Sequence, residues 1–145
     1  MQVRVQPEPF DTAAELAALS ANRSDVGAIA SFTGLVRADD GLTALTLEHY
    51  PGMTERQLAA IAAKAEARWP VLAGTVIHRH GRLVPGDAIV LVAIASPHRA
   101  AAFEACSFLM DWLKTKAPFW KAEEGPWGTR WVRAKATDDQ AAQRW

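Results

Sequence analysis

The segment that most constrains the fold is an unbroken apolar run at residues 88–95, AIVLVAIA. It follows the turn residues Pro85-Gly86-Asp87 and is closed by Ser96-Pro97. A run of this kind, rich in Val and Ile, is typical of a strand that is buried on both faces. The sequence therefore predicts a central strand inside a layered domain.

The other predicted elements mix strands and helices without a regular alternation. Strands are expected at residues 1–6 (an edge strand), 26–36, 45–49, 74–83, 119–121 and 129–132, and helices at residues 13–21, 54–69 and 97–117. Capping boxes are predicted for Thr12 with Glu15 and for Thr54 with Gln57. The predicted turns are typical of β-hairpins, and the strands and helices do not alternate as in βαβ units, so an α+β fold is favoured over a doubly wound sheet. We expect one domain over residues 1–145.

Composition argues against several classes of protein. Sixteen basic and sixteen acidic residues cancel, which argues against a general nucleic-acid or membrane binder. The single cysteine, Cys106, cannot form an internal disulfide or a thiolate zinc site. No apolar run approaches the roughly 20 residues of a membrane span, and the N-terminus lacks an apolar signal core. We therefore expect a cytoplasmic protein.

The longest predicted helix carries two basic residues at its start. Ser96 is a good N-cap residue and Pro97 suits the first helical position. His98 and Arg99 then occupy the first turn, where the helix dipole disfavours cations. With the free backbone amides they would form a pocket for a phosphate or a carboxylate. Two exposed surface cations are an equally good interpretation of this feature alone.

Lys114 is a candidate because it shares a helical face with apolar residues. It falls within a stripe formed by Arg99, Phe103, Cys106, Ser107, Met110 and Ala117. A partly desolvated lysine there can act as a base, a nucleophile or an oxyanion partner. The ordinary alternative is a lysine near a helix end that snorkels to solvent.

Lys121 and Arg37 are weaker candidates when each is taken alone. Lys121 lies seven residues after Lys114, among aromatic residues of a predicted extended piece, and could face the same pocket. Arg37 ends the predicted strand SFTGLVR, in which Gly34 permits close backbone approach or a bulge.

Two other polar features are better explained by structural roles than by functional ones. His78 and His80 lie two apart on a predicted strand and so share a face, but no third metal ligand is evident. A solvated strand face is therefore the favoured interpretation, and no metal site is expected. Cys106 lies on the apolar stripe with no base paired to it, so buried packing is favoured over a nucleophilic role.

Taken together, several segments resemble the large, catalytic subunit family of the molybdopterin synthases. They are SFTGLVR (31–37), LTLEHYPGM (45–53), VIHRHGRLVPGD (76–87), SPHRAAAFEA (96–105) and MDWLKTKAPFWK (110–121), followed by WV near the end. They occur in the family's order and cover nearly the whole chain. EHYPGM and KTKAPFWK are the most specific of these motifs.

The resemblance implies an α/β-hammerhead-like fold with a mixed or antiparallel sheet, and a homodimer. Each large subunit would bind one small, ubiquitin-like sulfur-carrier subunit to give a heterotetramer. The activity implied is that of a sulfurtransferase. It moves sulfur from the thiocarboxylate of the carrier's Gly-Gly tail to cyclic pyranopterin monophosphate and forms the dithiolene of molybdopterin, with no metal or redox cofactor.

The family's site residues can be carried over position by position. Its catalytic lysines match Lys114 and Lys121. Its substrate-binding residues match Phe32, Arg37, His98, Arg99, Met110 and Lys135, the last at a position where relatives often carry arginine. Lysine lacks the bidentate fork of arginine.

The chemistry of the substrate and the donor agrees with this set of cations, because one carries a phosphate and the other ends in an anionic tail. We expect His98 and Arg99 to bind phosphate or pterin, and Lys114 and Lys121 to stabilise oxyanion charge and assist proton transfer. His98 and Lys114 are 16 positions apart, or about 24 Å along one helix. We therefore expect His98 and Arg99 to reach the site from a partner subunit.

The residues leave two rival interpretations open. The first is a different transferase or hydrolase that uses the same cations on another small phosphorylated metabolite. The second is a non-enzymatic module whose aromatic C-terminal third binds a peptide tail. Turnover with the pterin precursor and a thiocarboxylated carrier separates both from a molybdopterin synthase.

Overall fold

The computed structural model describes residues 1–132 and 140–145, and the apolar run forms its strand β6 (Ala88–Ser96). This strand pairs antiparallel with β2 (Ala28–Leu35) on one side and with β4 (Ala73–Arg79) on the other. Strand β1 (Gln2–Gln6) adds to the outer side of β4 in parallel. The first sheet therefore has the order β1-β4-β6-β2, and the predicted central strand and edge strand are both confirmed.

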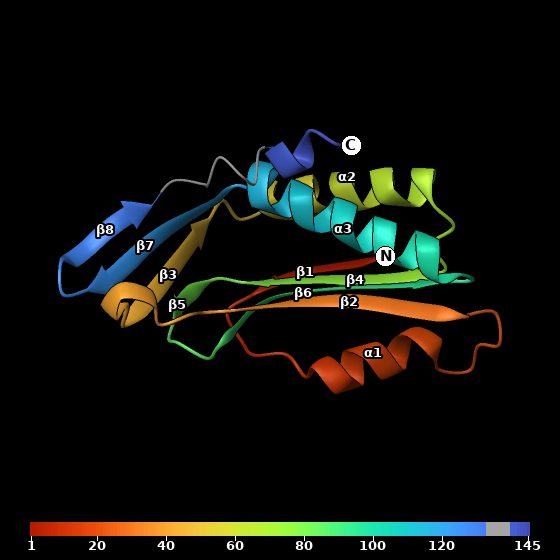
Figure 1. Cartoon of the computed structure of the whole chain (residues 1–145), viewed down its shortest axis with the longest axis horizontal. Helices are drawn as coiled ribbons and strands as arrows, with labels where there is room; N and C mark the ends of the chain where they lie inside the picture. Colours follow the sequence, from red (N-terminus) through yellow and green to blue (C-terminus); the bar gives the residue numbers. More distant parts are fainter. Residues whose placement is uncertain (133–139) are drawn as a thin grey trace.

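The second sheet has the order β5-β3-β7-β8 and is antiparallel throughout. Its strands are β5 (Gly81–Leu83), β3 (Ala44–His49), β7 (Phe119–Gly125) and β8 (Gly128–Val132). It extends from one end of the first sheet (Figure 1). The short pieces predicted at residues 119–121 and 129–132 thus form one hairpin.

Helices cover both faces of the first sheet. Helices α2 (Met53–Arg68) and α3 (Arg99–Lys116) lie side by side on one face, and α1 (Thr12–Ser20) lies on the other (Figure 1). A short 3-10 turn, η1 (Asp39–Gly41), connects β2 to β3. The predicted α+β fold, with mixed and antiparallel sheets and packed helices, is confirmed. Among the described residues, no helix is long and apolar enough to cross a membrane.

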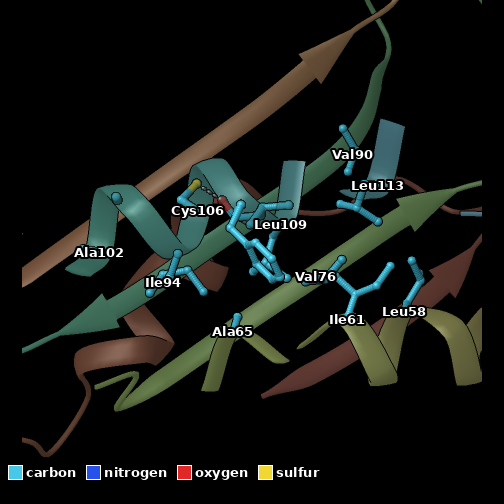
Figure 2. Close-up of a cluster of buried hydrophobic side chains, with 14 residues drawn as sticks. Leu58, Ile61, Ala65, Val76, Val90, Ile94, Ala102, Cys106, Leu109 and Leu113 are labelled. Carbon is cyan, nitrogen blue, oxygen red and sulfur yellow. Dashed lines mark hydrogen bonds between the residues drawn. The ribbon is translucent and has the colours of Figure 1, made fainter. Parts of the chain in front are cut away.

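The core explains why β6 is apolar at nearly every position. Val92 and Ile94 of β6 face α2 and α3, where they pack with Leu109 and the side chains drawn in Figure 2. Ala93 and Ala95 point to the opposite face and pack against Leu19 of α1. Since both faces are covered, alternation of polar and apolar residues is absent from this strand.

The strand predicted at residues 74–83 is two strands in different sheets. Strand β4 ends at Arg79, and β5 begins at Gly81, whose φ is +90°. A left-handed backbone angle favours glycine and bends the chain. The buried guanidinium of Arg79 fixes the bend, because it donates to the carbonyls of Pro7 and Ala88.

All three predicted helix starts are wrong by one or two residues. Asp11, and not Thr12, caps α1 by accepting a hydrogen bond from the Ala14 amide. For α2, the Glu55 carboxylate accepts from the Gly52 amide. Thr54 is instead buried one position inside the helix, and its hydroxyl donates to the Tyr50 carbonyl.

Helix α3 begins two positions later than its sequence suggests. Its N-cap residue is His98, and Ser96 is the last residue of β6. The Ser96 hydroxyl is fully buried and donates to the Pro70 carbonyl at 3.0 Å. Because a tertiary acceptor holds this hydroxyl, it cannot cap the helix.

Candidate active site

A cavity of about 560 Å³ opens where the C-terminal part of α3 meets both sheets. Its walls come from β2, β3, β4, β6, β7, β8 and α3. Six lining side chains carry the chemistry considered below, namely Phe32, Arg37, His78, Met110, Lys114 and Lys121. Three of these six side chains are cations, and the described residues that line the cavity include no carboxylate.

Lys114 and Lys121 meet in this cavity although they come from different kinds of element. Lys114 lies in the last turn of α3, and Lys121 lies in β7, between Leu47 of β3 and Val132 of β8. Helix α3 ends at Lys116, and the chain reverses to start β7 at Phe119. The expectation that both lysines face one hollow is therefore confirmed by the geometry.

The face of α3 that is buried differs from the apolar stripe predicted to contain Lys114. The buried face of α3 contains Ala102, Ala105, Cys106, Leu109 and Leu113, whereas Phe103 is 65% exposed. Lys114 is an exposed residue beside that face, so its ammonium lies in an open cavity and not in the core. Lys116, by contrast, lies over the Trp112 ring and does not line the cavity.

Three of the other predicted substrate-binding residues line the same cavity. Phe32 comes from β2 and is 42% exposed as a residue, and Met110 comes from α3 one turn before Lys114. Arg37 follows β2, and its largely exposed guanidinium forms an ion pair with Asp39 at 2.9 Å. The cavity therefore offers two apolar side chains and a third cation to a ligand.

His98 and Arg99 do not line the cavity of this chain. They begin α3, and Lys114 lies in its last turn, which puts the two ends about 22 Å apart at 1.5 Å per residue. A contribution from a partner subunit stays a prediction. Lys135 lies outside the described residues.

His78 is the functional candidate that sequence reasoning missed. Its ring is partly buried, lines the cavity and stacks on Phe119, with ring centroids 3.8 Å apart and an interplanar angle of 16°. The interpretation of His78 as part of a solvated strand face is therefore wrong. The usable signal was its position two residues after Val76, because Val76 belongs to the core face of the same strand.

The surroundings of His78 keep its imidazole neutral. Burial lowers the pKa of His78 to about 4, although its hydrogen bond to the Arg79 carbonyl opposes this, and the positive charges of Lys114 and Lys121 lower the pKa further. The Nδ1 atom lies 2.8 Å from the Arg79 carbonyl oxygen. Because a carbonyl only accepts, Nδ1 carries the ring proton and Nε2 carries a lone pair.

Cys106 is buried, as its position on the apolar stripe predicted. Its Sγ lies 3.8 Å from the Val92 carbonyl oxygen of β6, and burial raises the pKa of the thiol to about 11 (Figure 2). A thiol in this state is a poor nucleophile. Among the described residues, no group of three His, Cys, Asp or Glu side chains could hold a metal ion.

The fold and the cavity together define a class, an α+β protein of two sheets whose cavity holds one lysine from the last turn of α3 and one from β7. The MoaE protein family model matches residues 5–116. The molybdopterin synthase catalytic subunit of Mesorhizobium japonicum is 59% identical, over 99% of this chain and 92% of that protein. Its counterpart in Escherichia coli K12 is 54% identical, over 99% of this chain and 97% of that protein.

Solved structures agree with these sequence relationships. The molybdopterin biosynthesis MoaE protein from Burkholderia ambifaria superposes with a TM-score of 0.86 at 52% identity, over 99% of this chain and 97% of that one. A complex of subunits 1 and 2 of molybdopterin-converting factor from Helicobacter pylori shares the fold, with a TM-score of 0.75 at 23% identity. It covers 92% of this chain and 90% of that one. The chain belongs to the MoaE family, which confirms the resemblance found in its sequence.

Proposed function

We propose that this chain is the catalytic subunit of a molybdopterin synthase. Its reaction is the transfer of sulfur from the C-terminal thiocarboxylate of a small ubiquitin-like carrier subunit to cyclic pyranopterin monophosphate, which forms the molybdopterin dithiolene. The observation that carries this proposal is the lysine pair, Lys114 and Lys121, which lines one cavity together with Arg37. Family membership supports the same conclusion, because the curated relatives named above are molybdopterin synthase catalytic subunits.

The cavity suits a donor and a substrate that are both anionic. Its volume of about 560 Å³ is in the range of small-molecule sites. Arg37 lies at the exposed side, where its guanidinium would exchange the ion pair with Asp39 for a phosphate, and Phe32 and Met110 offer apolar surface to a flat pterin ring. In this proposal the carrier's tail enters the same cavity, and a complex of two subunits among the structural neighbours supports a small partner of this kind.

The chemical step needs charge stabilisation at the acyl carbon of the tail. The thiocarboxylate sulfur first bonds to a side-chain carbon of the pterin as the bond from that carbon to an oxygen leaving group breaks, which leaves the carrier joined to the pterin as a thioester. Water then adds to the acyl carbon, and the ammonium groups of Lys114 and Lys121 stabilise the negative charge that develops on the acyl oxygen. When the bond between the acyl carbon and sulfur breaks, the sulfur stays on the pterin as a thiolate and the carrier leaves as a carboxylate. A transient acyl group on Lys114 is an alternative route to the same product.

Assembly and location complete the proposal. In a homodimer within a heterotetramer, His98 and Arg99 of one protomer would supply anion-binding groups to the cavity of its partner. The cytoplasmic location expected from the sequence stays a prediction.

The test is reconstitution with purified thiocarboxylated carrier and cyclic pyranopterin monophosphate, with the dithiolene product measured directly. Lys114→Ala and Lys121→Ala should each lower kcat by about a hundredfold or more, the scale for loss of one group that stabilises an oxyanion. Lys116→Ala is the matched control, because Lys116 lies in the same helical turn but outside the cavity lining. It should keep kcat within about twofold.

Two results would contradict the proposal. Absence of dithiolene product with the wild-type protein would favour another phosphorylated metabolite as the substrate. A loss of carrier binding in the Lys114→Ala variant, with turnover unchanged at a saturating carrier concentration, would favour a binding module without catalysis.

A further inference from the structure

The lysine pair shares its cavity with one neutral imidazole. His78 and Lys114 both line the cavity, and the Lys114 ammonium has no hydrogen-bond or ion-pair partner among the described residues. The Nε2 atom of His78 likewise has no hydrogen-bond partner among those residues. The Lys114 ammonium, a donor, and Nε2 of His78, an acceptor, therefore belong to residues that line the same cavity, and neither has a partner among the described residues.

Two contacts fix the orientation of the His78 ring. The Nδ1 proton is held by the Arg79 carbonyl at 2.8 Å, and one ring face is held by Phe119 at 3.8 Å between centroids. A ring held along one edge and one face cannot flip freely. Nε2 is therefore presented to the cavity as a fixed acceptor.

We propose that His78 is a positioning residue, whose neutral Nε2 accepts a hydrogen bond from the Lys114 ammonium and sets where that cation stands during sulfur transfer. This inference rests on the function proposed above. Nε2 is a nitrogen acceptor that carries no negative charge, so it orients an ammonium without neutralising it. A carboxylate in the same place would cancel the charge that the anionic donor and substrate need.

The ring is unsuited to the alternative role of a general base. With a pKa of about 4, its conjugate acid is a much stronger acid than an ammonium, so proton transfer from Lys114 to His78 is strongly uphill. The neighbouring charges that face the ring, Lys114 and Lys121, and the nearby His49 all act in the same direction. His78 is thus an acceptor that stays neutral through the reaction.

The kinetic test compares substitutions that separate packing from hydrogen bonding. His78→Phe keeps an aromatic ring against Phe119 and removes the acceptor, whereas His78→Gln restores an acceptor oxygen near the position of Nε2. We expect His78→Phe to lower kcat on the order of tenfold, with KM for the pterin substrate unchanged and kcat largely recovered in His78→Gln. His80→Phe is the matched control, since His80 lies two residues away and does not line the cavity, and its kcat should be unchanged.

The second readout is spectroscopic and needs no turnover. With cyclic pyranopterin monophosphate bound, the ¹⁵N resonance of His78 Nε2 should shift in Lys114→Ala and stay in place in Lys116→Ala, and the ligand is needed because Nε2 and the Lys114 ammonium form no hydrogen bond in the free protein. An unshifted resonance in Lys114→Ala would overturn the inference, and so would equal losses of kcat in His78→Phe and His78→Gln.

If His78→Phe fails to fold, His78→Asn replaces it, because the shorter amide of asparagine cannot reach the Nε2 position. Equal kcat in the Asn and Gln variants would also overturn the inference. A wild-type protein without turnover would refute the proposed function, and the resonance would still test the contact.

Discussion

At the scale of single residues, the surroundings of a side chain decide its chemistry more than its type does. His78 and Cys106 are both common reactive residues, yet burial makes the ring a weaker base and the thiol a weaker acid. In each case the neutral form is favoured, because a low-dielectric environment disfavours the charged form. Lys114 keeps its contact with the open cavity, and this suits an ammonium that acts by its charge.

The pH dependence of stability should report the state of His78. The folded pKa of about 4 lies below the unfolded value of 6.5, so the unfolded state binds more protons between these pH values. The free energy of unfolding should therefore fall by up to about 3 kcal/mol as pH is lowered from 6.5 to 4. Urea unfolding of wild type and His78→Phe across this window isolates the effect, because the variant lacks it. Parallel curves for the two proteins would show that His78 does not titrate in this way.

Cys106 should resist thiol reagents while the protein is folded. With its thiol buried against β6 and its pKa raised to about 11, little thiolate forms at pH 8. Labelling with a maleimide should be at least a hundredfold slower in buffer than in denaturant, an order of magnitude set by the cost of opening the core. Mass spectrometry of the labelled protein measures both rates. Fast labelling of the folded protein would place the thiol near the surface.

At the scale of elements, the interior of each helix follows from its apolar pattern, but its first residue does not. Several residues that can cap compete within two positions, as Asp11 and Thr12 do before α1. Ser96 has the right side chain for a cap, yet its hydroxyl is bonded to Pro70 from another segment. The residue that caps a helix is therefore the one whose side-chain oxygen lies within hydrogen-bond distance of the free amides in the folded chain.

The cap of α1 can be tested with neighbouring residues. Asp11→Ala should lower the free energy of unfolding by about 1 kcal/mol, because the Ala14 amide loses its acceptor. Thr12→Ala should change it by less than about 0.5 kcal/mol, since Thr12 is the first helical residue and makes no capping bond. Chemical denaturation with circular dichroism measures both variants. The reverse order of losses would restore Thr12 as the cap.

At the scale of the whole molecule, the cavity exists only because two sheets meet beside the end of α3. Lys121 belongs to the second sheet, whereas His78 belongs to the first. Their proximity depends on the bend at Gly81 and on the return of β7 alongside β3. The complete site therefore needs segments that lie far apart in the sequence.

The shared site of the proposed homodimer can be tested by mixing protomers. Lys114→Ala and the double variant His98→Ala/Arg99→Ala should each be nearly inactive as pure dimers. If each site combines α3 of one protomer with the start of α3 from its partner, a mixed dimer holds one intact site. Refolding the two variants together in equal amounts should then restore about a quarter of wild-type activity, because half of the dimers are mixed. Activity no higher than that of the parents would place His98 and Arg99 outside a shared site.

The sequence by itself determined the central strand, the α+β class, the buried cysteine and the family, because these depend on local apolar patterns and on motifs read in order. It also singled out Lys114 and Lys121, which lie in one specific segment. Only the tertiary structure decided the break between β4 and β5, the caps of the helices and the place of His78. Each of these depends on a partner from a distant segment, Pro7 for Arg79, Pro70 for Ser96 and Phe119 for His78, and a local pattern contains no information about such a partner.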